Sequence, residues 1–169
     1  MRAALALVLV LFATGTARAQ LYPQAEAQAL ALARETIVLR SVQGPDNRMI
    51  DVARVYARAL REAGWAESEV DIVEVDDTAY LIATWPDSDP SLGPVVLSAH
   101  MDVVEARPED WERDPFNPVV ENGFLYGRGA SDTKFDASLA VAALIELPAR
   151  AFGRSARSWS PIRATRKPR

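Results

Sequence analysis

The chain has 169 residues, enough for one ordinary domain, and hydrophobic residues make up 49% of it, so its composition allows a buried core. It has no cysteine, which excludes a disulfide framework or a thiolate metal site, and a single histidine, His100. Residues 20–148 carry ten basic and twenty-three acidic side chains, whereas residues 149–169 carry seven basic side chains and no acidic one. Such a basic end can mark a tail that binds nucleic acid or membrane, or a segment never selected as protein.

Residues 1–19 have the pattern of a secretory signal peptide. Arg2 makes the start positive, residues 3–13 form an apolar run that is too short to span a bilayer, and a small-x-small pattern precedes cleavage between Ala19 and Gln20. An uncleaved membrane anchor is the alternative. In both cases we expect the mature chain to lie outside the cytoplasm, either secreted or periplasmic. We expect no stable membrane association once the signal is removed.

Helical and strand patterns alternate through the acidic part of the chain. Alanine and leucine recur at helical spacing over residues 24–40, and a second helix is expected to begin at Asp46 or Asn47 and to end near Ala63. The short apolar run 94–99 is typical of a strand buried on both faces. This alternation predicts an α/β fold, a layered sheet with flanking helices. Further strands are expected at residues 70–75 and 79–83, a hairpin at 119–126 and a last helix at 134–147, while the buried face of the second helix should include Ile50, Val55, Ala59 and Leu60.

His100 and Asp102 directly follow the apolar run 94–99. In α/β sheets ligands gather at the carboxyl ends of strands, and residues two apart in extended backbone point to the same side. One imidazole nitrogen could therefore bind a metal while a nearby carboxylate holds the other N–H. The alternative is a histidine that merely ends a strand, because His-x-Asp is a short pattern with many chance matches.

A second acidic loop, residues 126–134, precedes the last expected helix. Gly127 and Gly129 let the backbone turn sharply and approach other groups closely. Asp132 then lies at the helix start, where it could serve only as an N-cap. A phosphate-binding loop is excluded, because no Gly-Lys-Ser/Thr follows.

Together, these segments closely resemble the zinc-dependent exopeptidase and deacylase family of carboxypeptidase G, aminoacylase, acetylornithine deacetylase and succinyl-diaminopimelate desuccinylase. The resemblance covers most of residues 24–147, and its diagnostic part is 95–138. One departure is Phe135, where the family usually has glycine. The segments that carry the resemblance are Leu97-Ser98-Ala99-His100-Met101-Asp102-Val103-Val104, Trp111-Glu112-Arg113-Asp114-Pro115-Phe116 and Gly127-Arg128-Gly129-Ala130-Ser131-Asp132-Thr133-Lys134.

The resemblance implies a fold, a site and a reaction. The fold would be the first part of a zinc-peptidase catalytic domain. His100 would be a ligand of one zinc ion, Asp102 the catalytic carboxylate that orients it, and Asp132 the carboxylate that bridges two zinc ions. The reaction would be metal-assisted hydrolysis of an amide bond in a small peptide or an N-acyl amino acid. The resemblance also allows a homodimer, but only for the intact protein.

The same family needs a Glu-Glu pair, a further acidic ligand and a second histidine. No histidine follows His100, and no acidic residue follows Glu146. The two-zinc site is therefore incomplete, and we expect this chain by itself to be inactive. The expected divisions are a signal peptide at 1–19, the N-terminal part of the catalytic domain at 20–147, and an out-of-frame, disordered tail at 148–169.

The tail can be read in another frame. Taking the third base of each codon with the first two of the next, and choosing the free third bases, turns residues 157–169 into Ile-Val-Val-Ala-Tyr-Ser-Gly-Asp-Glu-Glu-Thr-Thr. This is a hydrophobic strand that ends in the Glu-Glu motif of the family. We infer that one base was lost, or two gained, near codon 147. The alternative is a non-enzymatic product whose basic tail binds acidic surfaces. We expect no nucleic-acid partner, because the tail lacks interleaved aromatic residues and repeats.

Overall fold

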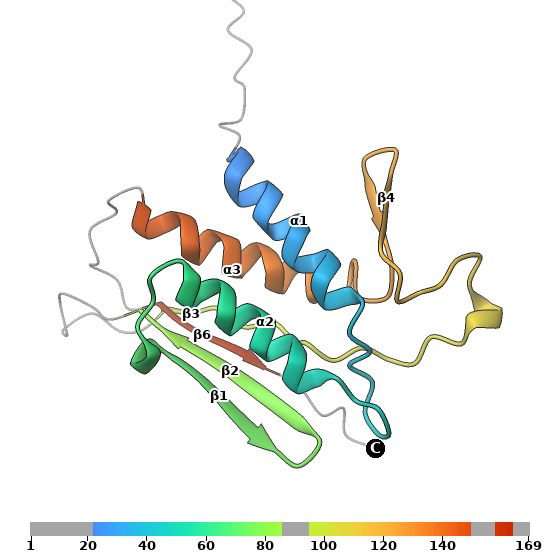
Figure 1. Cartoon of the computed structure of the whole chain (residues 1–169), viewed down its shortest axis with the longest axis horizontal. Coiled ribbons are helices and arrows are strands. Elements are labelled where there is room, and N and C mark those ends of the chain that lie inside the picture. Colours follow the sequence, from blue (N-terminus) through green and yellow to red (C-terminus); the bar gives the residue numbers. More distant parts are fainter. Residues whose placement is uncertain (1–21, 86–94, 150–157, 164–169) are drawn as a thin grey trace, which may run out of the picture.

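Helices and strands alternate in the computed structural model, which describes residues 22–85, 95–149 and 158–163 (Figure 1). The strands form one four-stranded sheet and one two-stranded hairpin. The predicted α/β class is confirmed. Among the described helices, none has the length and apolar character that a bilayer crossing requires. The elements are α1 (Pro23–Ile37), α2 (Met49–Glu62), η1 (Glu67–Glu69), β1 (Val70–Val75), β2 (Thr78–Thr84), β3 (Val95–Val96), η2 (Pro108–Asp110), β4 (Val119–Glu121), β5 (Phe124–Tyr126), α3 (Lys134–Ala149) and β6 (Ser158–Arg163).

Helix α2 provides much of the core. Its apolar residues recur every three or four positions, so one face is buried against β1 and β2. Val55, Ala59 and Leu60 are buried as predicted, and Ile50 is partly buried. The helix stops before Gly64, whose φ of 93° suits glycine far better than other residues. Helices α1 and α3 pack against each other and against α2, as Figure 1 shows.

The four-stranded sheet has the order β1-β2-β6-β3. Strands β1 and β2 form an antiparallel hairpin in which Val70 pairs with Ala83. Strand β6 lies antiparallel to β2 and parallel to β3. Along β2 every second residue is buried, so one face of this strand faces the core. Ala79, Leu81 and Ala83 are the buried residues.

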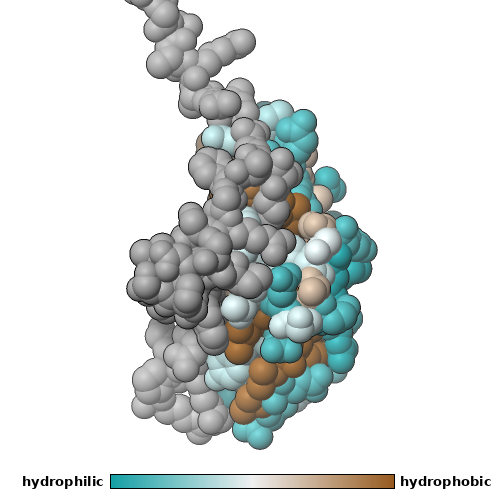
Figure 2. All heavy atoms as spheres, turned by 90° about the vertical axis from the view of Figure 1, so that its left-hand side faces the viewer, coloured by the Kyte–Doolittle hydropathy of each residue, from teal (hydrophilic) through white to brown (hydrophobic). Residues whose placement is uncertain are grey.

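Strand β3 differs from its prediction. We expected burial on both faces, but Val95, Val96 and Leu97 are 53%, 54% and 43% exposed. The reason is that β3 is an edge strand of the described sheet, and β6 is its neighbour there. Apolar side chains at an edge stay exposed unless a further layer covers them. On the face shown in Figure 2, hydrophobic patches likewise interrupt a mostly hydrophilic surface.

The C-terminal part also differs from its prediction where it is described. Residues 148–169 were expected to be disordered, but α3 continues to Ala149 and residues 158–163 form β6. Strands β2 and β3 would otherwise leave open backbone edges, which favour pairing with any extended segment. Trp159 and Ile162 are residue types that favour strands. Residues 150–157 and 164–169, and the expected signal peptide at 1–19, lie outside the described residues.

A cluster of polar side chains is buried between the three helices. The Tyr56 hydroxyl donates to the Lys134 carbonyl over 3.0 Å and lies 3.1 Å from the Ser138 hydroxyl. The Thr36 hydroxyl is 3.4 Å from the same tyrosine oxygen and donates to Leu32 O over 2.9 Å. Burial lowers the pKa of Lys134 from its usual 10.5 to about 7, and the negative charge of Asp102 opposes this change.

Truncating the core of α2 should destabilise the chain strongly. Leu60 is 0% exposed, so Leu60→Ala should lower the free energy of unfolding by about 2–5 kcal/mol through lost burial and a residual cavity. Leu139→Ala is the matched control, because Leu139 is 42% exposed on α3 and its loss should cost about 0.5 kcal/mol or less. Urea unfolding of both variants measures the difference. Equal losses would show that α2 does not pack on the sheet as described.

The buried lysine should make stability depend on pH. With a pKa of about 7 in the folded chain and near 10.5 when unfolded, Lys134 binds its proton between these values only in the unfolded chain. Raising the pH within this window therefore favours the folded chain, by up to about 1.4 kcal/mol per pH unit. Urea unfolding of the wild type and of Lys134→Met at pH 7, 8 and 9 measures how much Lys134 contributes to the pH dependence of the free energy of unfolding. A constant difference between the two proteins across this range would contradict it.

Candidate metal centre

The structure brings His100, Asp102 and Asp132 together. The chain leaves β3 and reaches His100, whose imidazole lies between the two aspartates. Its Nε2 is 2.9 Å from Oδ1 of Asp132. Its Nδ1 is 3.0 Å from the backbone oxygen of Asp102 and 3.1 Å from Asp102 Oδ1. Both ring nitrogens therefore face acceptor oxygens, and the ring orientation is fixed from two sides.

Asp102 and Asp132 differ in their surroundings. Asp102 Oδ1 is buried and poorly aligned for a hydrogen bond to the ring, so the hydrogen bond of Nδ1 goes to the Asp102 backbone oxygen. The Asp132 side chain is 79% exposed and contacts His100 from the solvent side. An exposed carboxylate beside an imidazole nitrogen can turn to accept a cation, whereas Asp102, whose side chain is 33% exposed, lies beside the other ring nitrogen and helps to orient the ring.

Glycines allow the loop before Asp132 to pack closely. A side chain at Gly127 would lie 2.9 Å from Ile37, which α1 holds in the core. Gly129 has a φ of 93°, and a side chain there would lie 3.0 Å from the Lys134 stem. The sequence pattern predicted this close approach. The peptide bond that joins Asp132 to Thr133 is cis.

Hydrogen bonds from neighbouring segments hold both donor loops. The Ser41 hydroxyl donates to Met101 O over 2.7 Å, and the Val103 amide donates to Ser41 O over 3.0 Å. These bonds fix the backbone on either side of Asp102. The Thr133 hydroxyl donates to His100 O over 2.8 Å, which ties the two loops to each other.

Sequence reasoning had missed the buried partners behind this site. It assigned no role to Ser41, Thr133 or Lys134, although two of them lie in the Gly127–Lys134 segment. A signal was present for Lys134, because it is one of only two lysines in an arginine-rich chain. Ser41 gave no signal, since a single serine after a helix is common. Across residues 22–85 and 95–149, no group of three or more His, Cys, Asp or Glu side chains gathers to hold a metal ion.

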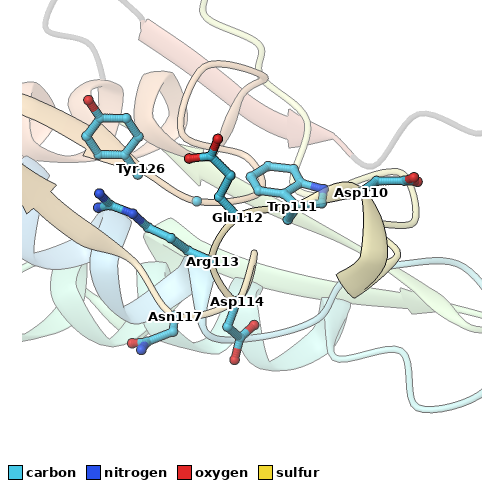
Figure 3. Close-up of a pocket in the computed structure, with 8 residues that line it drawn as sticks. Asp110, Trp111, Glu112, Arg113, Asp114, Asn117 and Tyr126 are labelled. Carbon is cyan, nitrogen blue, oxygen red and sulfur yellow. The ribbon is translucent and has the colours of Figure 1, made fainter.

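A separate pocket of about 360 Å³ lies beside the segment Trp111–Phe116 (Figure 3). The Arg113 guanidinium stacks 5.1 Å from the Tyr126 ring centre and pairs with Glu121 over 2.5 Å. The Arg128 guanidinium stacks 5.0 Å from the Trp111 ring centre. Both arginines are thus engaged with aromatic rings, and these contacts join the loop to the β4–β5 hairpin.

Comparison with known proteins relates the chain to hydrolases. Residues 96–156 match the model of Peptidase family M20/M25/M40. The mouse (Mus musculus) N-fatty-acyl-amino acid synthase/hydrolase PM20D1 is 52% identical over 60 residues, 36% of this chain and 12% of that protein. Aminoacylase-1 of Sus scrofa is 35% identical over 104 residues, 61% of this chain and 25% of that protein. Succinyl-diaminopimelate desuccinylase of Acidiphilium cryptum is 35% identical over 122 residues, 72% of this chain and 30% of that protein.

Comparison of the fold with solved structures leads to the same family. A metallo-carboxypeptidase of the M20 family, Sso-CP2 from Sulfolobus solfataricus, superposes with a TM-score of 0.68 at 18% identity, over 81% of this chain and 30% of that chain. The present chain spans less than a third of the length of each of these relatives. The resemblance predicted from residues 95–138 is thereby confirmed: the chain is related to the M20 metallopeptidases and amidohydrolases, and its fold matches part of the M20 metallo-carboxypeptidase structure.

Proposed function

We propose that this chain is the first part of a two-zinc hydrolase that cleaves an amide bond in a small peptide or an N-acyl amino acid. One observation carries the proposal: His100 is held between Asp102 and Asp132, with its Nε2 2.9 Å from an exposed carboxylate. Imidazole nitrogen and carboxylate oxygen are the donor types that catalytic zinc sites use. Metal-bound His residues usually have their second ring nitrogen held by another group, as Nδ1 is here.

The described donors fit part of such a site. Two donors of one tetrahedral zinc ion lie roughly 3.4 Å apart, so a slight outward turn of Asp132 from its 2.9 Å contact makes room for an ion. Catalytic zinc is usually held by three protein ligands, and here only His100 and Asp132 converge among the described residues. We therefore expect weak, labile zinc binding by the chain as written.

The proposed roles follow from the geometry. His100 offers Nε2 as a donor, because Nδ1 is held by Asp102. Asp132 offers an exposed carboxylate that can bridge two cations, and Asp102 keeps the imidazole oriented. In the complete site, two zinc ions would polarise the scissile carbonyl and lower the pKa of a shared water. The general base that accepts the proton of this water has no candidate next to His100 among the described residues.

We propose that a change of reading frame near codon 147 removed the remaining groups. The β6 register supports this, because Val95 pairs with Ser158 and Val96 with Trp159 in parallel. Continued one for one, this register brings the end of β6 level with His100. With the free third bases chosen as above, the alternative frame would encode Ile-Val-Val-Ala-Tyr-Ser over β6, followed by Gly-Asp-Glu-Glu. An ordered β6 argues against a disordered tail, but the codons of this segment still allow the change of frame. Pro161 does not decide between the two, because it pairs with Ile82 of β2 and lies beyond the two residues that pair with β3. Proline is tolerated where one side of a strand is open.

The relatives support the substrate class. By their names, they act on N-fatty-acyl amino acids, on acylated amino acids and on succinyl-diaminopimelate. All three names describe amides between an acyl group and an amino acid. We propose the same class for the intact protein, with small peptides as the neighbouring possibility that the carboxypeptidase-like fold supports. We also propose export from the cytoplasm, on the pattern of residues 1–19.

Restoring the frame should restore activity. The 169-residue chain should show no chelator-sensitive hydrolysis of dipeptides or N-acyl amino acids, whereas a frame-corrected gene product should hydrolyse at least one of them. Loss of a general base alone usually lowers rates by about 10²–10⁴-fold, and here metal ligands are missing as well. Both proteins are assayed side by side with zinc and with a chelator.

The control is His100→Ala in both forms. It should abolish turnover by the corrected protein and change nothing in the short one. Zinc-dependent turnover by the 169-residue chain, lost on His100→Ala, would contradict the incomplete site. A nucleotide sequence without an open alternative frame after codon 147 would refute the proposed change of frame.

Processing should remove the first 19 residues. The apolar run is followed by one good cleavage pattern, so the mature chain should begin at Gln20. Mass spectrometry of material exported by a bacterial host measures the N-terminus directly. Exported protein that retains Met1 would show that the segment is an anchor or has another function.

A further inference from the structure

Lys134 is buried in a chain that otherwise relies on arginine for positive charge. It is one of two lysines, and its side chain is 0% exposed. The Nζ donates to Thr36 O and to Leu39 O, each over 2.7 Å. These carbonyls lie at the C-terminal end of α1, where backbone oxygens lack partners within the helix and carry partial negative charge. The single Nζ atom of a lysine carries enough hydrogens to donate to both carbonyls, in its charged and in its neutral form.

The segment that Lys134 binds also holds the loop of His100. Two residues beyond Leu39, Ser41 donates to Met101 O over 2.7 Å and accepts from the Val103 amide over 3.0 Å. The backbone around Asp102 is thus attached to the turn that follows α1. Any shift of this turn moves Asp102 and, through Nδ1, the ring of His100.

The other end of Lys134 holds the loop of Asp132. Lys134 begins α3, two residues after Asp132, and its carbonyl accepts from the hydroxyls of Tyr56 over 3.0 Å and Ser138 over 2.7 Å. The stem of Lys134 packs beneath Gly129, where an added Cβ would lie 3.0 Å from Lys134 Cδ. The position of Asp132 is therefore fixed by the residue that binds the end of α1.

We propose that Lys134 is a positioning residue of the metal centre, which cross-links the turn after α1 to the start of α3 and so sets the spacing between His100 Nε2 and Asp132. The cross-link explains how a partial site can be pre-organised: the turn after α1, which holds the His100 loop, is joined to the start of α3, which follows Asp132, through one buried lysine side chain. Lys134 contacts neither donor side chain, so it acts through the backbone. The inference rests on the proposed role of His100 and Asp132 as metal donors.

The single histidine makes the test direct. In ¹⁵N-labelled protein without a histidine tag, the two ring nitrogens of His100 give the only imidazole signals. We compare the wild type, Lys134→Met and Leu60→Ala, first without metal and then in a Co²⁺ titration followed on these signals. In Lys134→Met the ring signals should move toward those of free histidine, and Co²⁺ affinity should fall by about tenfold or more. Leu60→Ala, which loosens the core elsewhere, should leave the ring signals near those of the wild type.

Chemical restoration of the lysine side chain distinguishes a positioning role of Lys134 from a general effect on packing. Because the chain has no cysteine, Lys134→Cys can be alkylated uniquely with bromoethylamine in the unfolded state and then refolded, which restores an ammonium on a stem of equal length. The alkylated protein should regain the wild-type ring signals and a Co²⁺ affinity within about threefold of the wild type. Unalkylated Lys134→Cys should behave like Lys134→Met.

The outcomes separate the two proposals. Wild-type ring signals in folded Lys134→Met, or equal shifts in Leu60→Ala, would overturn the positioning role. If Lys134→Met does not fold, Ser41→Ala decides, because it removes one of the two hydrogen bonds on the same path, the side-chain bond to Met101 O, without touching Lys134. Unchanged ring signals and affinity in Ser41→Ala would then overturn the role. If wild-type His100 signals depend on Lys134 but do not respond to Co²⁺, the metal assignment is wrong while the cross-link stands.

Discussion

The described site depends on one constraint: two loops far apart in the chain must meet closely enough for their donor atoms to share an ion, and His100 Nε2 and Asp132 Oδ1 do lie 2.9 Å apart. A single buried lysine side chain helps to meet this constraint, because Lys134 binds the carbonyl end of α1 from the first residue of α3. Its burial is costly, as the lowered pKa shows. The structure keeps it nonetheless, and neither donor side chain needs to contact it for its position to matter.

Much of this fold could be predicted from local patterns. The periods of α2 and β2, the Asn122-Gly123 hairpin and the start of α3 are local signals, and the structure places them as expected. The three predicted site residues were also found together. They could be chosen because α/β proteins place ligand-binding groups at the carboxyl ends of strands, and because residues 95–138 resemble one family, whose model matches residues 96–156.

Other features could not be predicted, because they depend on which surfaces meet. The apolar residues of β3 indicate burial, but burial requires a covering layer, and strand sequence does not say whether one is present. Residues 158–163 lack a strand period, yet the open edges of β2 and β3 give their backbone partners. A lysine is usually expected on the surface. Lys134 can be buried because the carbonyls at the end of α1 accept hydrogen bonds from its Nζ.

The use of arginine rather than lysine on the described surface has a consequence for proteolysis. All positive side chains on the surface of the described residues are guanidinium groups, because the other lysine, Lys167, lies outside them. A protease that cuts only after lysine therefore finds, among residues 22–149, a single susceptible bond, and the lysine side chain that it must recognise is fully buried against the end of α1. Cleavage there requires at least local opening of α1 from α3. The rate of that one cut is thus a measure of how often the end of α1 opens from the start of α3.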